Sequence, residues 1–296
     1  MFQRYFTFFM LGILRLASYL PLGVLHLFSN GMAILLFYVI RYRRGVVESN
    51  LQRSFPDKTS AQRRRIARRY YAHLGDLLVE SLRSERMSEG EYAKRVEVLN
   101  PEFVNQYHSR GQSVVVLAMH YANWEWMLSL PLALNPTVLF VYKPLSNSVF
   151  DRHFSKVRNR FGGKVVSMSI ALRKIIEAQA ANEPVLTWLA ADQAPPWFHK
   201  LWIRFLNQDT QFFDGPSKIA QRFNQPVLIQ YVRRVKRGYY QTWFETLVED
   251  PLGMDQAEIL KLYANRMEAH IRLAPEFYLW SHRRWKHQRP ADQSLS

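Results

Sequence analysis

From residue 113 onward, the chain alternates between short apolar runs and stretches with helical spacing. The apolar runs are rich in Val, Leu and Ile, and they cover residues 113–119, 137–142, 164–168, 185–190 and 226–232. The stretches between them predict helices over residues 124–134, 149–161, 170–181 and 215–223. Strands joined by helices need crossover connections, which make neighbouring strands parallel and buried on both faces. The sequence therefore predicts an α/β fold with a mostly parallel central sheet flanked by helices.

Elements on both sides of this alternating region are also predicted. Residues 239–248 predict a further strand, antiparallel and at an edge of the sheet, and a helix is expected over 255–273. Residues 41–95 indicate a basic helical region in which Thr59 or Ser60 caps a helix. Its arginines either form a solvated face over an apolar stripe or contact anionic headgroups. They are Arg41, Arg43, Arg44, Arg53, Arg63, Arg64, Arg65, Arg68 and Arg69.

The N-terminal region contains 25 consecutive residues, 16–40, without a formal charge. About 20 apolar residues are enough to cross a bilayer core of roughly 30 Å. Pro21, Gly23 and Ser29-Asn30-Gly31 interrupt the segment, so two interfacial helices, a shallow hairpin or buried core helices are alternatives to a span. We interpret residues 1–42 as a membrane-anchoring segment and 43–296 as one domain. The arginines that follow the segment predict a cytoplasmic position for that domain.

Composition narrows the possible partners and chemistries. The 296 residues carry a formal net charge of +16, which favours an anionic partner: nucleic acid, anionic lipid or an acidic protein. The chain has no cysteine, so disulfides, thiolate metal sites and a cysteine nucleophile are excluded. The sequence also lacks a G-x-S-x-G elbow, a P-loop and a dinucleotide-binding glycine fingerprint.

His120 and Glu125 form the most informative pair of polar residues. His120 directly follows the apolar run 114–119, and its spacing of five from Glu125 does not place the two on one face of a helix. We therefore expect His120 at the end of a strand and Glu125 in the first turn of the next helix. Reacting groups of α/β proteins gather at the carboxyl ends of strands. There Glu125 would orient His120, whose other nitrogen would act as a general base.

Four other polar residues are candidates for substrate binding. Arg158 and Arg160 lie where a helix is predicted to end, and either one holds a phosphate or oxyanion or simply offsets the helix dipole. Asp192 ends another predicted strand and is expected to be a positioning group. Asn123 is either a helix N-cap or a substrate ligand. The aromatic residues that line an acyl or glycolipid groove, or else fill the core, are Tyr121, Trp124, Trp126, Trp188, Trp197 and Trp202.

These residues favour direct transfer of an activated group. With neither a cysteine nor an elbow serine, a covalent acyl-enzyme is not expected, so a base would deprotonate an acceptor hydroxyl that attacks a donor bound at the same time. His120 and Glu125 have no second histidine nearby, so their spacing does not resemble a zinc helix motif, and no metal is predicted.

Several ordered motifs resemble those of the bacterial lipid A biosynthesis acyltransferase family, within the larger group that shares an H-x4-D/E motif. They extend over nearly the whole chain: residues 43–51 with Phe55-Pro56, 120–125, 142–144, 157–160, 191–193, 213–216 and 280–286. One departure is Ala194-Pro195-Pro196, which stands where a charged, glycine-containing turn is more usual.

The resemblance implies a glycerolphosphate-acyltransferase-like fold and a dyad of His120 and Glu125, with an arginine downstream that is Arg158 or Arg160. It implies acyl-acyl carrier protein as donor, without a further cofactor, and a phosphorylated glucosamine disaccharide as acceptor. Such an enzyme would lie at the bacterial inner membrane with its catalytic domain facing the cytoplasm.

Two alternatives remain open at the level of sequence. In the first, the protein is an acyltransferase whose acceptor is a lysophospholipid, an aminolipid or a glycosylated phosphoinositide. In the second, it is a membrane-tethered nucleic-acid-binding protein without enzymatic activity. The second alternative explains the charge but not the His120–Glu125 pair, and the sequence has no recognised nucleic-acid-binding motif, so no nucleic-acid partner is expected.

Overall fold

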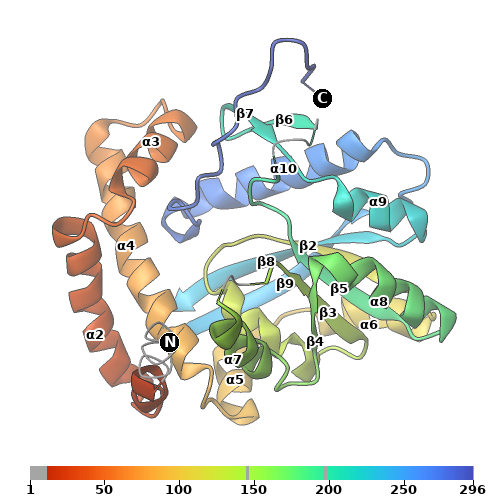
Figure 1. The fold of residues 1–296 in the computed structure, drawn as a ribbon, viewed down its shortest axis with the longest axis horizontal. Coiled ribbons are helices and arrows are strands. Elements are labelled where there is room, and N and C mark those ends of the chain that lie inside the picture. The colour runs from red at the N-terminus through yellow and green to blue at the C-terminus, as the bar shows by residue number, and fades with distance from the viewer. Residues whose placement is uncertain (1–11, 145–146, 197–198, 200, 296) are drawn as a thin grey trace.

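The computed structural model describes residues 12–144, 147–196, 199 and 201–295. Its centre is a seven-stranded sheet with the strand order β1-β9-β8-β2-β5-β3-β4 (Figure 1). β6 and β7 form a separate antiparallel pair. The strands are β1 (Val96–Val98), β2 (Val114–Ala118), β3 (Thr137–Tyr142), β4 (Lys164–Ser167), β5 (Val185–Ala190), β6 (Trp202–Phe205), β7 (Gln208–Gln211), β8 (Val227–Lys236) and β9 (Tyr239–Val248).

The predicted α/β fold with a mostly parallel sheet is confirmed. Every pairing in the large sheet is parallel except that of β8 with β9. The antiparallel direction of β9 was predicted, but its place at an edge is wrong, because β1 pairs along its outer side. β1 has three residues, too few to give a recognisable apolar pattern, and it covers the backbone groups that β9 would otherwise expose.

Helices surround the sheet and extend from one end of it. They are α2 (Leu22–Ile34), α3 (Arg44–Ser54), α4 (Ser60–Arg83), α5 (Glu89–Arg95), α6 (Pro101–Ser109), α7 (Ser148–Arg158), α8 (Met168–Ala180), α9 (Gly215–Arg222) and α10 (Gln256–Leu273). Shorter pieces are the π-helix η1 (Leu35–Val39) and the 3₁₀ helices η2 (Trp124–Leu132) and η3 (Pro275–Phe277). The expected cap of α4 is Thr59, which forms a reciprocal capping box with Gln62.

A helix is present where one is predicted over residues 124–134, but it is not an α-helix. The segment is the 3₁₀ helix η2, and it contains Pro131. Proline has no backbone N–H and its ring clashes with the preceding turn, so a regular α-helix does not continue through it. The tighter form keeps Glu125 in the first turn after β2, as expected from the sequence.

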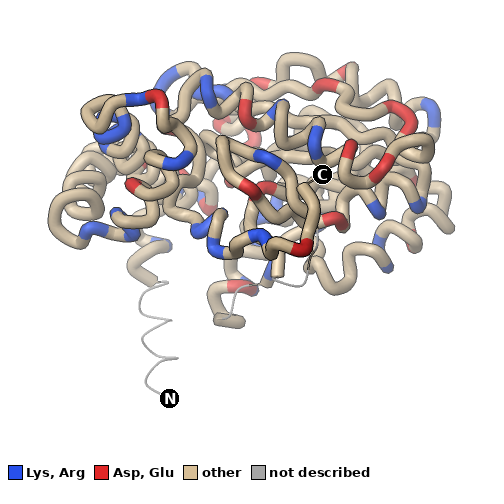
Figure 2. Tube along the Cα trace, turned by 90° about the horizontal axis from the view of Figure 1, so that it is seen from above, with Lys and Arg blue, Asp and Glu red and all other residues tan. Residues whose placement is uncertain are grey.

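The basic residues before the sheet gather at one end of the molecule. Figure 2 shows many of them over α3 and α4, beside α2. A cavity of about 650 Å³ lies between these helices, and its lining includes Arg63, Arg64 and Arg68 together with Glu48. The arginines of this region therefore border a groove as well as open solvent.

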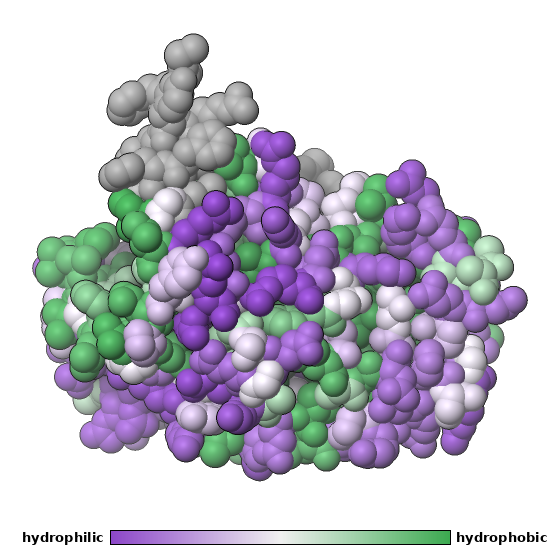
Figure 3. Space-filling model, turned by 90° about the horizontal axis from the view of Figure 1, so that it is seen from below, coloured by the Kyte–Doolittle hydropathy of each residue, from purple (hydrophilic) through white to green (hydrophobic). Residues whose placement is uncertain are grey.

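Helix α2 packs along α4 (Figure 1). It begins after Pro21 and continues through Ser29-Asn30-Gly31 into η1. The helical structure is therefore interrupted at the proline but not at the triplet. Within the described residues, one helix, Leu22–Val39, is long and apolar enough to cross a membrane, and 22% of it is buried. Apolar side chains such as Leu27, Phe28 and Val39 are more than half exposed. Figure 3 shows a hydrophobic surface on this side of the molecule.

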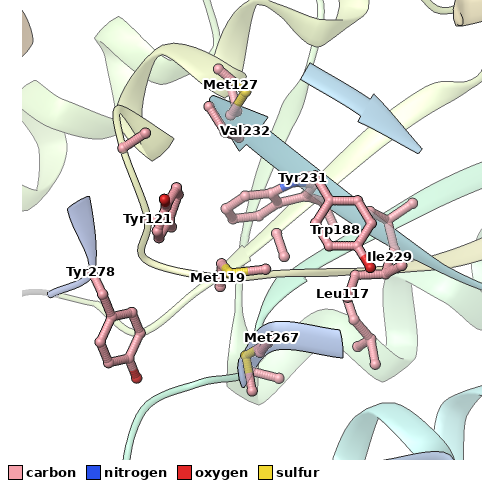
Figure 4. Close-up of a cluster of buried hydrophobic side chains, with 14 of the residues drawn as sticks. Leu117, Met119, Tyr121, Met127, Trp188, Ile229, Tyr231, Val232, Met267 and Tyr278 are labelled. Carbon is pink, nitrogen blue, oxygen red and sulfur yellow. The ribbon is translucent and has the colours of Figure 1, made fainter. Parts of the chain in front are cut away.

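The core is centred on the middle strands. All five residues of β2 are buried, as expected for a parallel strand covered on both faces. Figure 4 shows Leu117, Trp188 and Ile229 from three neighbouring strands close together, with Met267 of α10 beside them. This packing fixes the ends of β2 and β5, where the candidate site begins.

Candidate active site

His120 and Asp192 are brought together by the register of two neighbouring parallel strands. Ala118 of β2 pairs with Ala190 of β5, and each of the two polar residues lies two positions further along its chain. Both therefore emerge at the carboxyl edge of the sheet, where the sequence placed them. β2 is the fourth of the seven strands, so the pair lies at the middle of this edge.

Asp192 holds the imidazole of His120 through two hydrogen bonds. Its Oδ1 lies 2.6 Å from His120 Nδ1, and its Oδ2 accepts the backbone N–H of His120 at 3.0 Å. Burial alone raises the pKa of the Asp192 carboxyl, but the charge and hydrogen bonds of His120 leave it below its ordinary value. Burial alone lowers the pKa of His120, and the Asp192 carboxylate outweighs this so that the pKa is raised. Asp192 is thus an ionised acceptor, and Nδ1 carries the proton of the neutral ring.

The other ring nitrogen of His120 points toward solvent. The His120 side chain keeps 18% of its exposure, whereas that of Asp192 keeps 2%. Nε2 lies 3.1 Å from Nε2 of Gln193, an exposed residue. Because Nδ1 is protonated in the neutral ring, Nε2 has the lone pair and accepts this amide N–H. The outward nitrogen of His120 is therefore unprotonated in the neutral ring and is contacted by one exposed side chain, that of Gln193.

Glu125 does not bond to His120, which corrects the expected orienting contact. Among the described residues its partner is Arg158, whose Nη2 donates to both carboxylate oxygens, at 3.0 and 3.1 Å. The short 3₁₀ helix η2 carries Glu125 toward α7, while β5 supplies a carboxylate beside Nδ1. Glu125 still raises the pKa of His120 through space. The buried Nε of Arg158 has no hydrogen-bond partner in the described part of the protein.

The structure separates the two candidate arginines. Arg160 donates to three backbone carbonyls just after the end of α4, those of Ser84, Glu85 and Met87, at 2.7–3.1 Å. It therefore joins the end of α7 to the end of α4 and does not reach Glu125 or His120 by any hydrogen bond of the described residues. Arg158 is the arginine beside the site.

Comparison with known proteins agrees with this geometry. Residues 1–287 match the family model described as bacterial lipid A biosynthesis acyltransferase. The chain belongs to this family. It is similar to the lipid A biosynthesis lauroyltransferase of Escherichia coli K12, with 23% identity over 96% of this chain and 92% of the relative. It is also similar to the palmitoleoyltransferase of the same organism, again with 23% identity, over 99% of this chain and 95% of the relative.

Among solved structures, the chain is similar to the 1-acyl-sn-glycerophosphate acyltransferase PlsC from Thermotoga maritima. The identity is 16%, the TM-score is 0.38, and the match covers 86% of this chain and 94% of that one. Membership of the lipid A biosynthesis acyltransferase family makes the chain an acyltransferase, and the non-enzymatic alternative is set aside.

In this lipid A acyltransferase, Asn123 is placed as a cap. Its Oδ1 accepts the backbone N–H of Trp126 at 3.1 Å, its Nδ2 donates to Glu80, and the residue is fully buried. This favours the capping interpretation over contact with substrate. Of the aromatic candidates, Tyr121, Trp126, Trp188 and Trp202 are buried in the core, and Trp197 lies outside the described residues. The ring of Trp124 packs edge-on against His120 at 5.2 Å.

The sequence did not predict that the C-terminal segment holds this site in place. The C-terminal segment bonds to the loop after β2: Leu279 N–H donates to His120 O at 3.2 Å, and Ala122 N–H donates to Phe277 O at 3.0 Å. Ala122 has a left-handed φ of +51°, a conformation that a residue with a Cβ keeps only when its surroundings hold it. His282 Nε2 accepts the backbone N–H of Ala194, just after Gln193. Its pKa is lowered to about 4, chiefly by burial, so the ring is a neutral acceptor.

No group of three or more His, Asp or Glu side chains with the spacing of a metal site occurs among residues 12–144, 147–196, 199 and 201–295. The arrangement at the sheet edge is instead that of an acid–base site: a buried carboxylate, an imidazole with one outward nitrogen, and a neighbouring carboxylate–guanidinium pair. It can take a proton from a hydroxyl and stabilise the imidazolium that results.

Proposed function

We propose that the protein transfers a fatty acyl group from acyl-acyl carrier protein directly to a hydroxyl group of a lipid A precursor at the cytoplasmic face of the inner membrane. The observation that carries this proposal is the outward Nε2 of His120 on an imidazole held by Asp192. Family membership supplies the acyl transfer and the lipid A type of acceptor.

The reaction proceeds without a covalent enzyme intermediate. His120 Nε2 takes the proton of the acceptor hydroxyl while the hydroxyl oxygen attacks the carbonyl carbon of the donor thioester. The new ester bond forms, the bond to the carrier sulfur breaks, and the proton returns from His120 to the leaving thiolate. Asp192 stabilises the imidazolium between these steps, and it keeps Nδ1 protonated so that Nε2 remains the base.

Arg158 supplies positive charge next to the reacting atoms. Its Nη2 is engaged by Glu125, and its Nε has no hydrogen-bond partner among the described residues. A guanidinium can stabilise an oxyanion or a phosphate through its remaining N–H groups. In this proposal Glu125 fixes the orientation of Arg158 and adds to the negative field that raises the basicity of His120.

The charge distribution supports anionic substrates and an anionic surface. The arginine-lined groove between α3 and α4 lies at the same end of the molecule as the apolar face of α2 (Figures 2 and 3). An acidic carrier protein and a phosphorylated glycolipid are both attracted to such a surface. In this proposal the apolar face of α2 contacts the bilayer, and the neighbouring arginines contact the lipid headgroups.

The test is transfer in detergent micelles from lauroyl- or palmitoleoyl-acyl carrier protein to a lipid A precursor, followed by lipid mass spectrometry. His120→Ala is expected to lower kcat by at least about 10³-fold, because it removes the base, and to leave the circular dichroism spectrum unchanged. His108→Ala, at a partly exposed histidine of α6, serves as the control. Near wild-type turnover of folded His120→Ala would disprove the base assignment, and faster acylation of a lysophospholipid would disprove the acceptor.

A further inference from the structure

Helix α4 carries a stripe of three buried polar side chains that the proposed chemistry does not use. His73, Asp76 and Glu80 are spaced at i, i+3 and i+7, so they lie on one face of the helix. Each is at most 3% exposed. Most buried polar groups in proteins have hydrogen-bond partners, and here the partners belong to two different parts of the fold.

One set of partners is the loop that contains His120 and Glu125. His73 is neutral, since burial lowers its pKa to about 4, and its Nε2 lies 3.1 Å from the carbonyl oxygen of Ala122. Glu80 Oε2 accepts Nδ2 of Asn123 at 2.7 Å, and the backbone oxygen of Glu80 accepts Nε1 of Trp126 at 3.1 Å. Two turns of α4 thus hold the loop between the proposed base and the carboxylate that orients Arg158.

The other set of partners is helix α2. His26 Nε2 lies 3.0 Å from Glu80 Oε1, and Ser29 Oγ donates to Asp76 Oδ1 at 2.5 Å. A carboxylate can only accept, so His26 is the donor of the first bond. His26 and Ser29 of α2 therefore face the protein, whereas its apolar side chains Leu27 and Phe28 face outward.

Glu80 is the residue of the stripe that touches both parts. It has no exposure, its Oε1 is bonded to α2, and its Oε2 is bonded to Asn123 and also to Tyr240 of β9 at 2.7 Å. Asn123 in turn caps η2, which carries Glu125. A shift of α2 relative to α4 changes the position of this carboxylate, and the carboxylate fixes the start of η2.

We propose that Glu80 is a positioning residue that couples helix α2 to the active-site loop, so that α2 is part of the catalytic scaffold as well as an apolar surface. The proposal rests on the role of His120 in the proposed function. It predicts that breaking the contact of α2 with Glu80 slows turnover, whereas breaking its contact with Asp76 does not, because Asp76 has no hydrogen bond to the loop among the described residues.

The chain offers a matched pair of variants. His26→Ala and Ser29→Ala each remove one side-chain bond between α2 and a buried carboxylate of α4, one turn apart. We expect similar small decreases in Tm for both. We expect His26→Ala to lower kcat about fivefold to tenfold at unchanged KM, since displacement of a reacting group by well under 1 Å is enough for such a loss. Ser29→Ala should retain kcat within about twofold. Equal kcat values for the two variants would overturn the proposal.

A second pair tests the carboxylate itself. Glu80→Gln keeps an oxygen that accepts from Asn123 and Tyr240, so its kcat should stay within about threefold of wild type, while Glu80→Ala should lose tenfold or more. Failure of the conservative variant to restore turnover in a protein that folds would contradict a positioning role.

Hydrogen exchange separates failure of this coupling from failure of the proposed donor or base. Amide exchange over residues 120–126 should be faster in His26→Ala than in wild type or Ser29→Ala, whatever substrate the enzyme uses. Unchanged exchange there would refute the coupling even if transfer is observed, and faster exchange without any transfer from acyl-acyl carrier protein would refute the donor alone.

Discussion

Under the proposed mechanism, two buried carboxylates of this protein have opposite uses, although both are buried and both accept several hydrogen bonds. Asp192 and Asp76 are at most 3% exposed, and each accepts at least two hydrogen bonds. Burial alone raises the pKa of both carboxyls, and their partners nevertheless lower it. For Asp76 these partners are Arg237, Ser29 and Arg234, and for Asp192 the main one is His120.

The difference lies in the cation. Asp76 is balanced by two arginines, Arg234 and Arg237, which join α4, α2 and the β8–β9 hairpin. Asp192 is balanced by an imidazole that gains and loses a proton and has one nitrogen directed outward. A buried ion pair with a permanent cation contributes to structure, whereas one whose cation titrates and reaches solvent can perform proton transfer.

The largest expected effect comes from Asp192→Asn. The amide is nearly the same size, but it no longer stabilises the imidazolium or selects the Nδ1–H tautomer, so kcat should fall about 10²-fold or more. The raised pKa of His120 depends on this carboxylate, and the fraction of neutral base falls as pH falls through that pKa. Loss of the carboxylate should therefore move the acid limb of the remaining activity to lower pH. Measuring kcat over the full pH range tests both effects. A variant with high kcat and an acid limb at the same pH as in wild type would show that Asp192 has no part in the mechanism.

Asp76→Ala should reverse this pattern by changing stability more than chemistry. It leaves Arg234 and Arg237 without their buried counter-charge, which destabilises a protein by about 3 kcal/mol, at the low end of such losses because Arg237 is partly exposed. We expect a lower urea midpoint and a kcat per folded molecule within about twofold of wild type. A large loss of kcat in a protein that remains fully folded would contradict the structural role assigned to Asp76.

The sequence predicts these two carboxylates unequally well. Asp192 ends an apolar run parallel to the one before His120, so strand periodicity was enough to place both residues at the same edge. Asp76 and Glu80 lie on a helix whose apolar stripe dominates the pattern, and their partners Ser29 and Asn123 are 47 and 43 residues away in the chain. No local periodicity predicts such contacts. The same limit explains Glu125: its spacing from His120 predicts a place in the first turn of the next helix, where it lies, but its partner Arg158 comes from α7.

Arg158 and Arg160, at the edge of the site, also differ in how their side chains are bonded. Arg158 leaves its Nε without a partner among the described residues, whereas Arg160 is saturated by three carbonyls. Arg158→Gln should lower kcat/KM about tenfold with little change in Tm, because its charge acts on substrate. Arg160→Gln should lower stability by about 1–2 kcal/mol and keep kcat/KM within about twofold. Steady-state kinetics and thermal melts of both variants decide the assignment, and an exchange of the two phenotypes would reverse it.

The smallest expected effect concerns the exposed amide that contacts His120 Nε2. Gln193→Glu places a carboxylate where the amide N–H now donates, so it stabilises the protonated ring and raises the pKa of His120 further. Less neutral base is then present at a given pH, and the acid limb of kcat/KM should move to higher pH, with roughly a threefold loss at pH 7 that disappears in alkaline buffer. Gln106→Glu makes the same charge change at an exposed position of α6 and should leave the profile in place. Identical profiles for the two variants would show that Gln193 does not face the base in solution, and the outward nitrogen of His120 would then be open to solvent before the acceptor binds.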